Sequence, residues 1–264
     1  MAEYKELIYE KIGKKALITL NRPEKLNALS INLKQEIMKA LDEAGNDKEV
    51  RVVVLTGSGD RAFCAGQELT ETRSTDISKA ETEAYTWILG FKNLYEAFRR
   101  QSKVVIAMIN GVATGSGLQI TLLCDFRIMS ANARIGVPEI DVGYPLITGS
   151  GLLWDIIGPA KTKDLALTGR LISADEALSW GLVNKIFPHE ELREKTLEFA
   201  NFLTEKAPVA TAVNKAFYRA IEAPLFHEAF EHAVIGHTQG YASGEPQEYQ
   251  KKFFEKRRER KTQH

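Results

Sequence analysis

The spacing of apolar residues changes several times along the 264-residue chain. Short runs rich in β-branched residues predict strands at 4–10, 15–20, 51–57, 103–109, 126–129, 133–137 and 182–187, the first two joined as a hairpin at Gly13. Helical spacing, from i to i+3 and i+4, predicts helices at 31–44, 84–99, 173–180 and from 189 onward. Strands that alternate with helices in this way predict an α/β fold.

Capping residues set the expected limits of several helices. Ser30 is a good N-cap for the first helix, which Gly45 is expected to end. Ser173 and Glu176 form a capping box for a later one. The C-terminal helical region is expected to break at Pro208, Pro224 and Gly244, and residues 70–80 to form a mobile surface segment.

A glycine-rich stretch follows the buried strand at 104–109. Gly111, Gly115 and Gly117 fall within seven residues, and a nearly continuous apolar helix follows to Cys124. Glycines let the backbone turn sharply and let a ligand come close to it. A helix start also points unpaired N–H groups toward that ligand. The expected ligand is therefore an anion, or an oxygen that becomes anionic during a reaction.

The stretch lacks residues that two common phosphate-binding motifs require. A dinucleotide fingerprint requires a glycine where Ile120 stands, and a P-loop requires a lysine that the stretch lacks. A tight turn without any ligand stays open from the loop alone.

Charge and composition narrow the function classes. Lys plus Arg and Asp plus Glu each total 35, so no net charge recruits nucleic acid or an anionic membrane. Cys64 and Cys124 stand in apolar surroundings, which suits a reducing compartment. With no signal peptide and no apolar run of membrane-spanning length, we expect a cytoplasmic protein without a membrane span.

Two suggestive clusters are set aside. His227, His232 and His237 recur every fifth residue, which turns them about 140° apart on a helix, so no metal site is expected. The basic tail at 251–261 fits a solvated helix whose aromatic residues dock onto protein better than a nucleic-acid site, so nucleic acid is not an expected partner.

Taken together, several motifs resemble the crotonase superfamily, the enoyl-CoA hydratase/isomerase family. The matching segments are Leu20-Asn21-Arg22-Pro23, Asn27-Ala28-Leu29-Ser30, Ala62-Phe63-Cys64-Ala65-Gly66, Asn110-Gly111-Val112-Ala113, Gly115-Ser116-Gly117, Cys124-Asp125, Pro138-Glu139, Ala177 and Trp180-Gly181-Leu182-Val183. They follow the family's order and cover nearly the whole chain.

The resemblance implies a spiral of repeated ββα units. It places a crotonase-like core with an acyl-CoA site at 1–195 and a helical C-terminal trimerisation region at 196–264. It further implies a homotrimer or a dimer of trimers. The implied substrate is an acyl-CoA thioester, with coenzyme A as part of the substrate and no separate cofactor or metal.

The resemblance also assigns roles to both small-residue stretches. The backbone N–H groups of Gln67 and Ser116 are the implied oxyanion hole for the thioester carbonyl, and Ser116 replaces the family's usual glycine. Hydratases of the family use two glutamates, at the positions of Gln119 and Glu139 here. An amide cannot exchange a proton near neutral pH, so Glu139 is left as the acid/base. Ile147, where hydratases tend to have glycine, is expected to crowd out water.

These departures slightly favour Δ3-to-Δ2 isomerisation of an enoyl-CoA over hydration by Glu139 alone. A low-turnover CoA-binding relative and an RNA-binding relative stay as alternatives. The residues expected to bind the substrate or CoA are Arg22, Lys25, Leu26, Ala28, Ala65, Gly66, Leu69, Gly115, Ile147 and Lys256, the last donated by a neighbouring subunit.

Overall fold

Two sheets form the centre of the computed structural model, which describes residues 3–71 and 79–262. The main sheet has the order β1 (Leu7–Ile12), β2 (Lys15–Leu20), β3 (Val52–Gly57), β5 (Val104–Ile109), β7 (Phe126–Ser130) and β10 (Lys185–Phe187). The small sheet has the order β4 (Ala62–Cys64), β6 (Val112–Thr114), β8 (Arg134–Gly136) and β9 (Leu171–Ser173). All neighbours are parallel except the β1–β2 hairpin and the β8–β9 pair.

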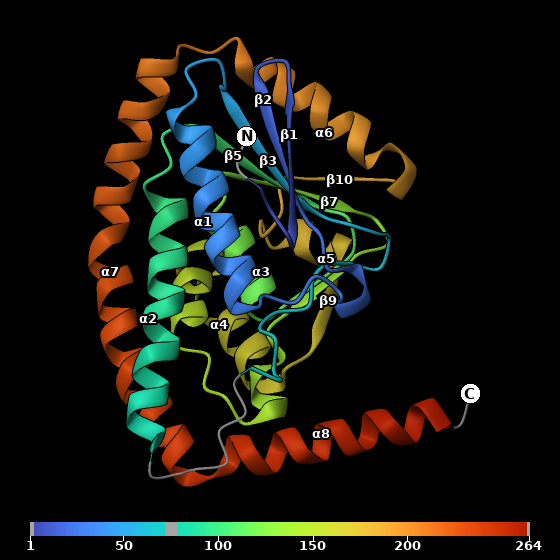
Figure 1. Ribbon diagram of the computed structural model, residues 1–264, viewed down its shortest axis with the longest axis vertical. Helices are drawn as coiled ribbons and strands as arrows, with labels where there is room; N and C mark the ends of the chain where they lie inside the picture. Colours follow the sequence, from blue (N-terminus) through green and yellow to red (C-terminus); the bar gives the residue numbers. More distant parts are fainter. Residues whose placement is uncertain (1–2, 72–78, 263–264) are drawn as a thin grey trace.

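The chain passes three times from the main sheet to the small sheet and then to a helix (Figure 1). These passes are β3, β4 and α2 (Ala80–Arg99); β5, β6 and α3 (Ser116–Leu122); and β7, β8 and α4 (Thr148–Thr168), the last preceded by the 3-10 helix η3 (Pro138–Val142). This repetition is the predicted spiral of ββα units, and it confirms the predicted fold class.

The strands of the main sheet are buried on both faces. Val53 and Leu55 point into the large core beneath α1 (Ile31–Asn46) and α2, whereas Val52 and Val54 point into a second cluster beneath α6 (His189–Thr204). Side chains alternate across a strand, so a continuous apolar run is what a sheet covered on both faces requires. Because α6 spans residues 195 and 196, the segment at the expected domain boundary packs directly on this sheet.

Two local expectations were wrong. The first helix does not end at Gly45 but continues to Asn46, and Gly45 instead lies where a Cβ would be 3.2 Å from Oε1 of Gln101. The sequence pattern also gave no strand for β4, β6 or β9, each of which has three residues, too few to show a period. The predicted Ser30 cap is confirmed, since its side chain accepts a hydrogen bond from the N–H of Leu33 at 2.9 Å.

The C-terminal region is helical, as expected, through α6, α7 (Pro208–Ser243) and α8 (Glu245–Thr262), while α5 (Ala174–Ser179) follows the confirmed Ser173 cap. The expected break at Pro224 is wrong, because α7 continues through it. Packing along α2, where Phe230 contacts Tyr95, outweighs the backbone hydrogen bond that a proline removes.

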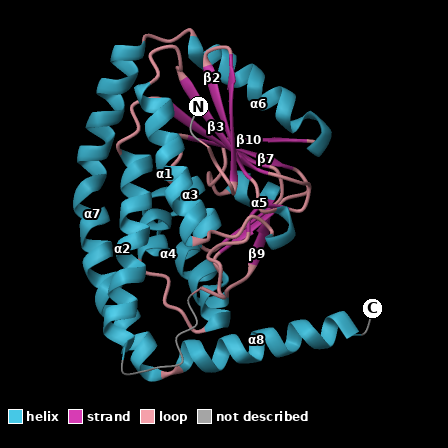
Figure 2. Ribbon diagram, viewed as in Figure 1, coloured by secondary structure: helices cyan, strands magenta, loops and turns pink. Residues whose placement is uncertain are grey.

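Figure 2 shows that helices form one side of the molecule, with α7 and α2 side by side, while α8 runs along one end away from both sheets. Most of the expected mobile segment at 70–80 lies outside the described residues. Among the described helices, α7 included, none carries an apolar stretch of the length that a bilayer crossing requires.

Candidate active site

A cavity of about 1390 Å³ lies where the small sheet, α2, α3, α4, α7 and α8 meet. We call it the large cavity. Of the residues predicted from the sequence, it is lined by Lys25, Leu26, Ala28, Ala65, Gly66, Gln67, Leu69, Gly115, Ser116, Gln119, Glu139, Ile147 and Lys256. Segments more than 200 residues apart in the sequence therefore meet around one space.

The two small-residue stretches lie against each other at the wall of this cavity. Gly66 has φ +95° and Gly115 has φ +56°, and a residue with a side chain would be strained in these backbone conformations. A Cβ on Gly66 would lie 2.9 Å from the Thr114 carbonyl oxygen and 3.6 Å from the Ser116 nitrogen. Gly117 has even less room, because a Cβ there would overlap the carbonyl oxygen of Cys64. Glycine is thus required for the two backbones to approach.

Backbone geometry leaves both predicted donors available. Gln67 forms a parallel bridge to Leu29 in which the partners of Leu29 are the carbonyl of Gly66 and the N–H of Glu68. The N–H of Gln67 therefore points away from Leu29. Ser116 is the first residue of α3, and the first N–H groups of a helix have no partner within it. Their assignment as an oxyanion hole stays a prediction.

Glu139 and Gln119 meet in the same cavity. The Nε2 of Gln119 donates to Oε1 of Glu139 at 2.8 Å, while Oε2 of Glu139 is buried without a hydrogen-bond partner among the described residues. Burial raises the pKa of Glu139 to about 7, and the hydrogen bond from Gln119 offsets part of that rise. A carboxyl group with a pKa near neutrality can both take up and release a proton at physiological pH.

The Gln119 amide is held in one orientation by two hydroxyl groups. Its Oε1 accepts from the Tyr95 hydroxyl at 2.7 Å and from the Thr148 hydroxyl at 3.2 Å. Burial raises the pKa of Tyr95 well above its usual value, so this hydroxyl keeps its proton and acts as a donor. Both hydroxyls contact Oε1, and the NH₂ group faces Glu139. Gln119 therefore donates to the carboxylate and does not accept a proton from it.

Thr148, the first residue of α4, donates to the Gln119 amide, whereas its neighbour Ile147 packs elsewhere. Ile147 lines the large cavity, but its Cδ1 occupies the space beside Gly236 on α7 that a Cβ would need. Gly149 closes the other side of the amide, since a Cβ there would lie 2.9 Å from the Cδ of Gln119. The expectation that Ile147 crowds out water stays a prediction, and Thr148 is the neighbouring side chain that hydrogen-bonds to the amide.

Cations collect at the mouth of the large cavity. Lys25 of the loop after β2 and Lys252, Lys256 and Arg258 of α8 all line it, and all four are exposed. The structure thus places Lys256 beside the cavity of its own chain. It does not bring Arg22 there, because that guanidinium contacts Glu6 at 3.0 Å and donates to the Ala28 carbonyl at 2.6 Å. Arg22 holds the loop that carries Lys25 and Leu26 instead.

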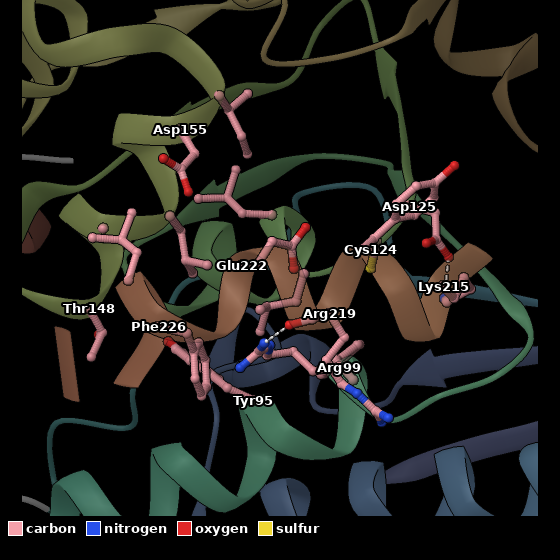
Figure 3. A pocket seen from close by; sticks show the side chains of 18 of the residues that line it. Tyr95, Arg99, Cys124, Asp125, Thr148, Asp155, Lys215, Arg219, Glu222 and Phe226 are labelled. Atoms are coloured by element: carbon pink, nitrogen blue, oxygen red, sulfur yellow. Dashed lines mark hydrogen bonds and ion pairs between the residues drawn. The ribbon is translucent and has the colours of Figure 1, made fainter. Parts of the chain in front are cut away.

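A second cavity of about 480 Å³, shown in Figure 3, lies between α2, α4 and α7. Two of its cations already have partners: Lys215 is 2.5 Å from Asp125, and Arg99 donates to the Arg219 carbonyl at 2.8 Å. It contains no glycine-built pair of backbone donors of the kind seen at Gly66 and Gly115. The large cavity is the better candidate for catalysis.

Sequence reasoning missed Tyr95 and Thr148. Tyr95 was assigned to the core as part of the aromatic stripe of α2, which is correct for its ring but not for its hydroxyl. A buried tyrosine hydroxyl needs a partner, and this requirement was the available signal. Thr148 carried no such signal, because its partner is 29 residues away.

Comparison with known proteins identifies the family of the chain. The family model for enoyl-CoA hydratase/isomerase matches residues 11–263. The chain belongs to the enoyl-CoA hydratase/isomerase family. It is 37% identical over 262 residues to a short-chain-enoyl-CoA hydratase of Clostridium acetobutylicum, covering 97% of each chain. It is 34% identical to a carnitinyl-CoA dehydratase of Salmonella typhi, covering 86% of this chain and 85% of that one.

Solved structures of this family agree. A crystal structure of an enoyl-CoA hydratase from Mycobacterium avium subsp. paratuberculosis has a TM-score of 0.85 at 26% identity, covering 96% of this chain and 97% of that chain. An enoyl-CoA hydratase from Bacillus anthracis has a TM-score of 0.75 at 31% identity, covering 88% and 91%. The family member described here is therefore an enzyme of the hydratase/isomerase type.

Proposed function

We propose that this enzyme shifts the double bond of an enoyl-CoA thioester from the Δ3 to the Δ2 position, with Glu139 as its single acid/base. The observation that supports this most is the orientation of Gln119, whose amide donates to Glu139 and is fixed by Tyr95 and Thr148. The two-glutamate hydratases that the chain resembles use a second carboxyl group beside the double bond, and an amide cannot exchange a proton in its place.

In the proposed reaction the Glu139 carboxylate takes a proton from the α-carbon. The electron pair of that C–H bond moves into the thioester, giving a dienolate whose oxygen accepts hydrogen bonds from the N–H groups of Gln67 and Ser116. The protonated Glu139 then returns the proton to the γ-carbon, and the double bond forms between the α- and β-carbons. No water is consumed, and the carboxylate is regenerated.

Hydration by Glu139 alone is the second candidate. The observation that favours it is the similarity to relatives named as a hydratase and a dehydratase. A low-turnover CoA-binding role is a further outcome that the turnover experiments below would reveal, and RNA binding through α8 would be tested by a salt-dependent RNA titration.

For the CoA part of the substrate, we propose that Lys25, Lys252, Lys256 and Arg258 contact the phosphates. Phosphate groups form strong charge-assisted hydrogen bonds with such cations. These four lie at one mouth of the large cavity, and Glu139 lies within it.

We infer that the first half of α7 is the assembly face. Val209, Val213, Phe217 and Ile221 recur every fourth residue and are 74%, 62%, 63% and 62% exposed. Such a stripe of large apolar side chains on one helix face is typical of a subunit interface. The trimer implied by the resemblance would bury it.

We expect Glu139→Gln to lower turnover of a 3-enoyl-CoA by about 100-fold or more, because the amide cannot take up the proton. In the wild type, kcat/KM should rise with pH along one limb with a midpoint near 7, since the ionised carboxylate is the base. Asp141→Asn, an exposed acid on the same cavity wall, is the matched control and should keep both rate and profile. Undiminished turnover in Glu139→Gln would remove Glu139 from the mechanism.

Gln119→Glu should introduce hydration of a short 2-enoyl-CoA, by about 10-fold or more over wild type, while changing isomerisation less. It should also move the pH midpoint upward, because a second carboxyl group 2.8 Å away opposes ionisation of Glu139. Tyr95→Phe is the control, since it loosens the amide without adding a carboxyl group. The proposal would be contradicted if the wild type already hydrated 2-enoyl-CoA efficiently and the Gln119→Ala variant kept the same hydration rate.

Phe217→Glu should dissociate the assembly, measured by light scattering after size exclusion, because a charge would be buried at its centre. Tyr85→Glu, which charges an equally exposed aromatic residue on α2, should leave the mass unchanged. A monomeric wild type, or an unchanged mass for Phe217→Glu, would show that this stripe is not the interface.

A further inference from the structure

One helix lines the large cavity from its catalytic end to its far end. Tyr95, Phe91 and Trp87 lie four residues apart on α2 and all line the cavity. At 1.5 Å per residue, Trp87 lies about 12 Å along the helix from the tyrosine that holds Gln119. The end of the cavity around Trp87 is therefore well separated from the reacting atoms.

The walls of this far end come from three elements. Trp87 is in edge contact with the His237 ring of α7, with ring centroids 4.7 Å apart, and stacks on Tyr144 at 5.8 Å. All three residues line the large cavity. Figure 1 shows why they meet, because α2 and α7 run side by side. Aromatic walls of this kind suit an extended apolar acyl group.

Two nitrogen atoms at this end lack partners. The Nε1 of Trp87 and the Nδ1 of His237 are both buried and make no hydrogen bond with the described residues. The neighbouring hydroxyls are satisfied: Tyr144 accepts from Nε2 of Gln250 at 2.5 Å and donates to Tyr241 at 3.3 Å. Buried polar groups in native proteins are almost always paired, so two unpaired ones in contact require an explanation.

We propose that this end of the cavity binds a hydroxyl group carried on the distal part of the acyl chain, so that the substrate is a hydroxylated rather than a purely hydrocarbon acyl-CoA. The proposal rests on the proposed function, because it takes the large cavity as the acyl-CoA site. It defines Trp87 and His237 as specificity residues that contact the far end of the acyl group, away from Glu139.

The chemistry of the two nitrogens selects this group. Indole Nε1–H can only donate, so it requires an oxygen acceptor. Burial lowers the pKa of His237 to about 4, so its ring is neutral at physiological pH, and Nδ1 either donates or accepts depending on the tautomer. A hydroxyl matches both tautomers, because its oxygen accepts and its hydrogen donates. A carboxylate would instead enter an apolar site without a countercharge, which is costly.

The test uses direct binding rather than turnover. Saturated acyl-CoAs, which have no double bond to shift or hydrate, are titrated into the full-length protein by calorimetry. They form matched pairs of equal length, from butanoyl to dodecanoyl, each with and without an ω-hydroxyl. We expect the hydroxylated member to bind about 5-fold more tightly or better at one length, the gain of one buried hydrogen bond.

Two variants assign that preference to the two nitrogens. Trp87→Phe keeps an aromatic wall and removes the N–H, and His237→Phe removes the other nitrogen. Each should reduce the preference while keeping the affinity for the plain acyl-CoA. Trp154→Phe, the same change at a tryptophan outside the cavity, is the matched control and should keep the preference. Melting curves check that each variant is folded.

The outcomes separate this inference from the proposed function. Equal or weaker binding of the hydroxylated member at every length in the wild type would overturn the hydroxyl site, whatever the variants do. So would a preference that survives in both variants. Binding of plain acyl-CoAs in that case would leave the proposed function standing. If no acyl-CoA binds at all, both proposals are wrong.

Discussion

The hydrogen bond between Gln119 and Glu139, together with the two hydroxyls that hold the amide, joins elements from all three turns of the spiral. Gln119 comes from α3, Glu139 from η3, and the two hydroxyls that hold the amide come from α2 and α4. Each turn of the ββα repeat therefore contributes one part of the same network. The rest of the site depends on this contact, because it sets which oxygen of Glu139 is occupied and which is left for chemistry.

The surroundings of Glu139 also explain why the pKa of its carboxyl group is raised to about 7. A buried carboxylate is destabilised by the loss of water, and hydrogen bonds from its own backbone N–H and from the Gln119 amide return only part of that stabilisation. Glycines make the burial possible, because Gly115 and Gly149 leave room where side chains would displace Glu139 or Gln119. A Cβ on Gly115 would lie 3.3 Å from Oε1 of Glu139. The same glycine thus opens the backbone for an oxyanion and makes space for the base.

Much of the fold and part of the site could be predicted from the sequence. Apolar runs predicted six strands of the main sheet, because a strand covered on both faces leaves a continuous signal, and Ser30 and Ser173 predicted two helix starts. The motifs placed Gln67, Ser116, Gln119 and Glu139 around one cavity. What failed was decided by packing: α7 continues through Pro224, and Gly45 makes room for Gln101 instead of ending its helix.

Contacts between distant residues were likewise beyond the sequence pattern. Nothing local in α2 shows that the Tyr95 hydroxyl meets the amide of Gln119, or that Trp87 meets His237 on α7. Arg22 does not reach the expected CoA site, because its guanidinium is paired with Glu6. The sequence pattern did not show this pairing, since Glu6 lies in a separate segment. These pairings depend on how the helices lie across one another, which apolar spacing alone does not specify.

The most direct measurement follows the proton itself. A 3-enoyl-CoA carrying deuterium on its α-carbon is incubated with the enzyme in heavy-oxygen water, and the product is analysed by mass spectrometry. One buried acid/base that takes and returns the proton predicts a 2-enoyl-CoA with part of the deuterium on its γ-carbon and no heavy oxygen. Unchanged 3-enoyl-CoA, together with conversion of a 2-enoyl-CoA in the same water to a 3-hydroxyacyl-CoA containing heavy oxygen, would contradict the isomerase account.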